Sequence, residues 1–138
     1  MAIHKTPELE TSNVEFAALA APRPLLLVSV GGDWTKNTPH VEFPYIQNVY
    51  KLYGQADQTR NVHFPDEDHG YQLKKRQAMY PFMVKHLRLN NSGVVDVDTG
   101  IYNETRNTIE SVETMRVFDE EHSLPDHALE PGAFVRFP

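Results

Sequence analysis

The 138-residue sequence contains no cysteine, so disulfide bonds, thiolate metal sites and cysteine nucleophiles are excluded. It has no basic block either: 13 Lys and Arg stand against 19 Asp and Glu, a net charge of −6 that argues against nucleic acid as a partner. No apolar run reaches the roughly 20 residues that a membrane span needs, so no membrane partner is expected. The first ten residues lack the hydrophobic core of a secretory signal, and the sequence as written predicts a cytoplasmic product.

A further absence concerns serine. Many serine hydrolases carry their nucleophile on a sharp strand-to-helix turn with the pattern G-x-S-x-G, and this sequence has no such pattern. Ser29 lies inside an apolar run, and Ser92 precedes a glycine but follows two asparagines. The same frame is missing at Ser12, Ser111 and Ser123.

The feature that organises the chain is the stretch 22–33. Two prolines end whatever comes before, and an apolar run from Leu25 to Val30 then stops at two glycines. A short run without polar alternation is typical of a strand buried on both faces, as in a parallel sheet covered by helices. This strand brings Asp33 to its carboxyl end, the edge of open α/β sheets where ligands bind.

The surrounding pattern predicts alternating helices and strands. In chain order we expect a helix over 14–21 capped by Asn13, a strand over 24–30, a helix over 41–54, a strand over 59–64, and a helix over about 73–88 with a kink or restart at Pro81. This order predicts an α/β fold with parallel strands, and two strands alone look like part of a larger sheet.

Three regions follow from this pattern: a lead-in (1–13), the α/β part (14–89) and a C-terminal extension (90–138) that packs on the domain or on a partner. Two apolar stripes are expected. One is the core face of the last helix, with Met79, Phe82, Met83 and Leu87; the other is a helical stripe in the extension, with Ile109, Val112, Met115 and Phe118.

Asp33 and His69 are the candidate catalytic residues. Each follows a predicted parallel strand, with one helix between them, so right-handed connections place both at one edge of the sheet. A carboxylate that orients an imidazole forms the acid–base half of a catalytic triad. Taken alone, Asp33 is more typical of a residue that shapes a turn, and a lone loop histidine such as His69 is usually solvated or structural.

Other interpretations of the same loops remain open. His63, Asp66, Asp68 and His69 are all potential metal ligands, although they match no recognised ligand spacing. Trp34 and Tyr71 flank the candidate residues, and they would line a substrate pocket or simply pack the loops.

Several segments together resemble the C-terminal half of α/β-hydrolases, in particular acetyl xylan esterase-like and dienelactone hydrolase-like carbohydrate esterases. The segments are residues 17–29, 32–35, 49–54, 68–71 and 76–80. The resemblance implies a partial α/β-hydrolase fold, made of the last strands and helices of a mostly parallel sheet, plus an irregular C-terminal tail. In that family the acid follows the penultimate core strand and the histidine follows the last, which matches Asp33 and His69.

The resemblance implies hydrolysis of a small-molecule or polysaccharide ester, with acetyl groups on xylan as the first candidate, without a cofactor. Members of the family are often exported. The nucleophile and the oxyanion hole have no counterpart here, so we expect the chain alone to be inactive and to need the missing N-terminal half. The alternatives are a non-enzymatic module that assembles through an exposed sheet edge, as a homo-oligomer or with another chain, and a small metal-dependent enzyme.

Overall fold

The fold of the chain was obtained as a computed structural model that describes residues 3–5, 10–129 and 132–134. It divides into two compact units, Met1–Asn103 and Glu104–Pro138, and each is described by itself. The first unit holds, in chain order, β1 (Ile3–Lys5), β2 (Glu10–Ser12), α1 (Asn13–Ala18), β3 (Leu25–Val30), α2 (Glu42–Leu52), the short 3-10 helix η1 (Ala56–Gln58), β4 (Thr59–Phe64) and α3 (Leu73–Leu87).

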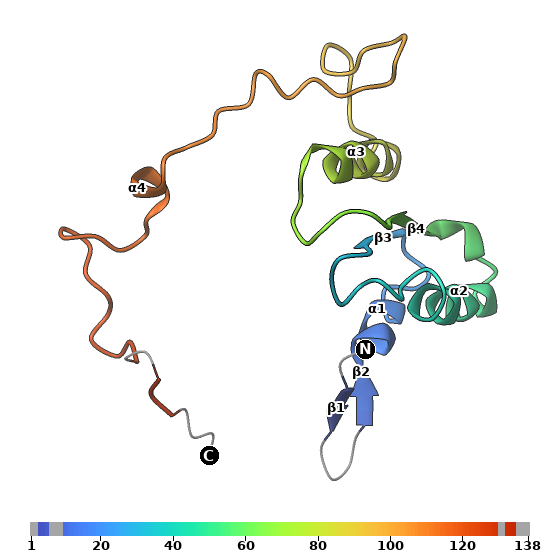
Figure 1. The fold of residues 1–138 in the computed structure, drawn as a ribbon, viewed down its shortest axis with the longest axis horizontal. Coiled ribbons are helices and arrows are strands. Elements are labelled where there is room, and N and C mark those ends of the chain that lie inside the picture. The colour runs from blue at the N-terminus through green and yellow to red at the C-terminus, as the bar shows by residue number, and fades with distance from the viewer. Residues whose placement is uncertain (1–2, 6–9, 130–131, 135–138) are drawn as a thin grey trace. The chain divides into compact units, whose positions relative to one another are not determined.

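The two predicted strands form a parallel pair, which confirms the α/β prediction. β3 and β4 run side by side in a register from Leu25 opposite Thr59 to Val30 opposite Phe64. α1 and α2 lie on one side of this pair and α3 on the other (Figure 1). β4 is the only neighbour of β3 among the described strands, so the other edge of β3 is open.

Within the region expected to be a lead-in, β1 pairs antiparallel with β2. Its last residue, Ser12, caps α1: Ser12 Oγ accepts from the Glu15 N–H, and the Glu15 carboxylate accepts from the Ser12 N–H at 2.8 Å. The prediction of Asn13 as the cap is wrong by one residue because this reciprocal pair satisfies the first turn and leaves Asn13 inside the helix. The helix also ends at Ala18, three residues earlier than expected.

α2 follows its sequence pattern closely. Ile46 and Tyr50 are buried, at 1% and 0% exposure, and form the core with Val14 and Ala18 of α1. The Tyr50 hydroxyl donates to the Arg23 carbonyl oxygen at 2.6 Å, so the largest core side chain also has a polar partner. Gly54 takes φ +66°, the left-handed conformation that ends the helix as expected.

α3 departs from its predicted packing. It is one helix across Pro81, so it does not restart there. Met83 and Leu87 are exposed, at 38% and 56%, because a two-stranded sheet offers little surface to a helix of 15 residues. The buried residue of α3 is Lys75, a cation that the apolar periodicity did not mark.

The second unit is largely irregular. Its helix α4 covers one turn, Val112–Met115, and the four residues of the expected stripe are 47–94% exposed. The predicted longer helix is wrong because an isolated turn without a packed face gains too little to propagate. Within the described residues, no helix is long and apolar enough to cross a membrane.

Candidate active site

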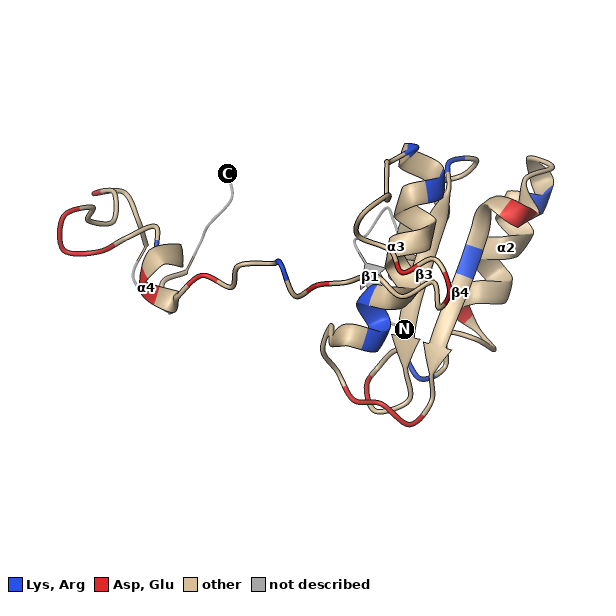
Figure 2. Cartoon of the chain, turned by 90° about the horizontal axis from the view of Figure 1, so that it is seen from above, with Lys and Arg blue, Asp and Glu red and all other residues tan. Residues whose placement is uncertain are grey.

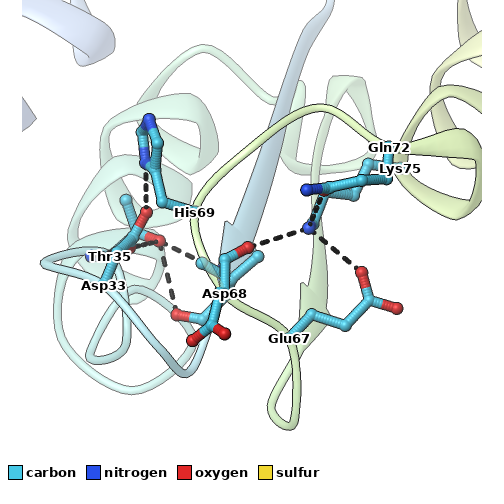
Figure 3. A network of polar contacts seen from close by, with 8 residues as sticks. Asp33, Thr35, Glu67, Asp68, His69, Gln72 and Lys75 are labelled. Atoms are coloured by element: carbon cyan, nitrogen blue, oxygen red, sulfur yellow. Dashed lines mark hydrogen bonds and ion pairs between the residues drawn. The ribbon is translucent and has the colours of Figure 1, made fainter.

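Asp33 and His69 meet at the carboxyl edge of the β3–β4 pair. Asp33 lies three residues beyond the end of β3, and His69 lies five residues beyond the end of β4. His69 Nδ1 is 2.9 Å from Asp33 Oδ2 (Figure 3). The structure therefore brings together the two residues that the sequence pattern placed at one edge, while their catalytic role stays a prediction.

Close contact between the two loops sets this geometry. The Gly31 N–H donates to the Phe64 carbonyl oxygen at 2.9 Å, and the Gly32 N–H donates to the Glu67 carbonyl oxygen at 3.0 Å. A Cβ on Gly31 would lie 1.8 Å from the Pro65 carbonyl oxygen, so no larger residue fits there. The pair of glycines allows the aspartate loop to lie directly against the histidine loop.

Thr35 holds the second carboxylate oxygen of Asp33. The Thr35 N–H and hydroxyl both donate to Asp33 Oδ1, each at 2.6 Å. The same hydroxyl oxygen accepts from the Val30 N–H at 3.0 Å and so ties the loop to the end of β3. Sequence reasoning did not identify Thr35; the signal was the Asp-x-Thr spacing, which suits a side chain that bonds the backbone two residues on.

These contacts favour the ionised form of Asp33. The Thr35 hydroxyl first, then the His69 and Thr35 N–H contacts, lower the pKa of Asp33 from 3.8 to about 2. The ionised carboxylate can only accept, so His69 Nδ1 carries the shared hydrogen, and in the neutral ring Nε2 is then the nitrogen with the free lone pair. Asp33 is 12% exposed and His69 80%, and Nε2 points away from Asp33 (Figure 3). The pair therefore presents an accessible imidazole beside a shielded carboxylate.

Thr35→Val is expected to raise the pKa of Asp33 toward its ordinary range, because it removes the first cause of the shift. Carboxyl-carbon NMR titration measures this directly. In the wild type, the bonded carboxylate stabilises the fold above the ordinary pKa of 3.8, and this contribution is lost as the pH falls through about 2. Asp96, whose pKa is lowered by Thr99, is the internal control and keeps its titration curve. If the titration curve of Asp33 is the same in Thr35→Val as in the wild type, Thr35 is not the first cause of the lowered pKa.

A cavity of about 500 Å³ opens beside the pair. It is lined by residues of α1, β3 and α2 and by Lys75 of α3, together with Asp33 and His69. Because it contacts β3 but no residue of β4, it lies along the open edge of β3. Trp34 and Tyr71 also line it, and they are 68% and 50% exposed. Both aromatic side chains are therefore free to meet a ligand, although their role in binding stays a prediction.

The potential metal ligands do not converge. His63 Nδ1 lies 2.8 Å from Ser29 Oγ, whereas His69 faces Asp33. Among the residues that the structure describes, no three His, Asp or Glu side chains are placed to hold an ion. Acidic residues gather instead in the loops beyond β3 and β4 (Figure 2). Ser29 is 2% exposed, which suits a structural hydroxyl and not an attacking one.

Comparison with known proteins places this geometry in context. No family model matches the chain, and a search of curated proteins finds no match. Among solved structures, methylesterase BT1017 is similar at 40% sequence identity with a TM-score of 0.68. The similarity covers 81% of this chain and 23% of the methylesterase, so the chain spans about a quarter of that protein's length. The chain is thus a small α/β structure, with a parallel two-stranded sheet and flanking helices, that matches part of an α/β-hydrolase esterase.

Proposed function

We propose that this chain supplies the acid–base part of a serine carboxylic-ester hydrolase. The observation that carries the proposal is the 2.9 Å contact between His69 and Asp33 at the sheet edge, beside an open cavity. The similarity to a methylesterase supports the same class of reaction.

In this mechanism His69 Nε2 takes the proton of a serine hydroxyl as the serine oxygen attacks the ester carbonyl. The nearby Asp33 carboxylate stabilises the imidazolium that forms. His69 then gives the proton to the departing alkoxide, and the alcohol leaves an acyl-serine. A water molecule then attacks the acyl-serine carbonyl while His69 Nε2 takes its proton, and His69 returns this proton to the serine oxygen as the acyl–serine bond breaks and the acid leaves. The reaction needs no cofactor.

The serine must come from a segment outside this sequence, which has no G-x-S-x-G pattern. The open edge of β3 is the place where a further parallel strand would pair. The cavity along that edge adjoins Asp33 and His69, so a nucleophile carried there would lie near His69 Nε2. The partner of this chain is therefore the nucleophile-bearing part of a hydrolase fold.

Two ester classes fit this chemistry. The similar protein's name favours a methyl ester, in which the leaving group is methanol. The sequence resemblance favours an acetyl ester of a sugar hydroxyl, in which the carbohydrate itself leaves. The exposed faces of Trp34 and Tyr71 suit stacking on a sugar ring in either case.

A chimera tests the proposal: the complete chain replaces the matched segment of methylesterase BT1017. We expect the chimera to hydrolyse a methyl ester. The chain alone should show no turnover, because it has neither the G-x-S-x-G turn that carries the serine nor an oxyanion hole. Methyl and acetyl esters of the same sugar, assayed in parallel, separate the two substrate classes. A folded but inactive chimera would contradict the proposal, and so would hydrolysis by the chain alone that persists in Asp33→Asn.

The second candidate is a non-enzymatic module that assembles through β3, favoured by the single neighbour of that strand. Sedimentation decides it: self-association that is lost when proline replaces Val28 supports the module, and a monomer with no partner contradicts it.

A further inference from the structure

A buried lysine supports the histidine loop. Lys75 lies in the first turn of α3, and its side chain is 2% exposed. This position is unfavourable for a cation, because the helix dipole is positive there and burial removes hydration. A residue that breaks two local rules needs a compensating set of contacts.

Three acceptors surround the ammonium group of Lys75 and match its three N–H donors (Figure 3). Lys75 Nζ donates to the Asp68 carbonyl oxygen at 2.9 Å and to Gln72 Oε1 at 2.7 Å. It also pairs with Glu67 Oε2 at 3.0 Å. The Lys75 hydrogen bond is the first cause that lowers the pKa of Glu67.

These contacts bracket His69. Two of the acceptors precede it in the loop, at Glu67 and Asp68, and one follows it at Gln72. The Glu67 carbonyl oxygen also accepts a hydrogen bond from the Gly32 N–H at 3.0 Å, so the residue that pairs with Lys75 is bonded to the aspartate loop as well. Because the His69 side chain is 80% exposed, little besides the loop backbone and Asp33 holds its ring.

Gly70, the residue after His69, lies against Gln72, one of the three residues that Lys75 contacts. Gly70 has φ +128°, and a Cβ there would lie 2.4 Å from Gln72 Nε2. Gln72 therefore covers the turn next to His69 while its amide oxygen accepts from Lys75. Lys75 is therefore connected to the His69 backbone from both sides: through Asp68 before it, and through Gln72 and Gly70 after it.

We propose that Lys75 is the positioning residue of the Asp33–His69 pair: it fixes residues 67–72 so that His69 Nδ1 stays on Asp33. Lys75 acts through the loop, because its three contacts are with residues 67, 68 and 72, and its value for catalysis rests on the proposed function.

The test is the ring nitrogen NMR spectrum of His69 in the full chain, recorded at alkaline pH where histidine rings are neutral. In the wild type we expect Nδ1 to carry the hydrogen. In Lys75→Met the Nδ1 and Nε2 signals should move toward each other, because the ring leaves Asp33 and samples both tautomers. Lys74→Met is the matched control: Lys74 pairs with Glu67 Oε1 at 3.2 Å but is 78% exposed, so the His69 spectrum should not change.

Gln72→Met covers the case in which Lys75→Met does not fold, since Gln72 is exposed and its loss removes one of the three contacts. The His69 signals should then shift in the same direction by a smaller amount. Wild-type signals in the folded variants would overturn the proposal, and so would an equal shift in Lys74→Met. The spectrum does not depend on ester hydrolysis, so an inactive chimera with the expected spectra would reject the proposed function alone.

Discussion

His69→Gln in the methylesterase chimera is expected to lower kcat by roughly 10⁴-fold to 10⁶-fold, the loss typical of removing the base of a serine triad. Glutamine fills a similar volume, but its amide cannot take the serine proton. The loss should appear in kcat with little change in KM, because no substrate contact is removed. Initial rates with a methyl ester, together with single-turnover kinetics, measure it.

The chain contains a matched control for this substitution. His122 Nδ1 lies 2.9 Å from Asp119 Oδ1 in an exposed turn, the same contact distance as in the candidate site. His122→Gln should leave kcat unchanged, whereas Asp33→Asn should lower it by about 10⁴-fold, because an amide favours the wrong histidine tautomer. Activity that survives in His69→Gln, or equal losses in His122→Gln, would reject the catalytic assignment.

Gly31→Ala is expected to lower the free energy of unfolding by about 3 kcal/mol, near the upper end for overpacking. The added Cβ would meet the Pro65 carbonyl oxygen at 1.8 Å, and this oxygen is a backbone atom that cannot rotate away. The aspartate and histidine loops must then separate, so the Gly31 N–H loses the Phe64 carbonyl oxygen as well. Urea denaturation followed by circular dichroism measures the change.

Gly54→Ala is the comparison for this experiment. A Cβ on Gly54 meets nothing within 4 Å, so alanine there adds only the strain of φ +66°, about 1 kcal/mol. Gly31→Ala should therefore be clearly less stable than Gly54→Ala. Equal stabilities would mean that the two loops do not lie in the described contact.

The predictable elements are those with a clear local pattern of apolar residues: a continuous run for β3 and helical spacing for α2. The run Leu25–Val30 and the spacing of Ile46 and Tyr50 each specify one element by local pattern, and β3 and α2 appear with nearly the expected bounds. Pairing Asp33 with His69 needed only the rule that parallel strands share an edge. These inferences depend on neighbours in sequence and on chirality.

The cap of α1 and the length of α4 were not predictable, because they depend on individual contacts and not on a periodic pattern of apolar residues. Ser12 became the cap of α1 through a reciprocal bond with Glu15, and Asn13 is an equally good cap by residue type alone. The stripe from Ile109 to Phe118 has helical spacing, but spacing without a packed surface produced a single turn. In each case the outcome depended on contacts that a periodic pattern does not contain.

The sequence by itself determined the parallel pair, its helices and the edge at which Asp33 and His69 lie, because short-range periodicity and right-handed connection suffice for these. It also excluded a cysteine nucleophile, and it contains no serine elbow. Only the tertiary structure decided three features: the 2.9 Å contact between His69 Nδ1 and Asp33 Oδ2, the hydrogen bond from Thr35 to Asp33, and the burial of Lys75 against the histidine loop. Hydrogen bonds have narrow limits of distance and angle, and which groups meet within those limits is known only once the loops are packed together.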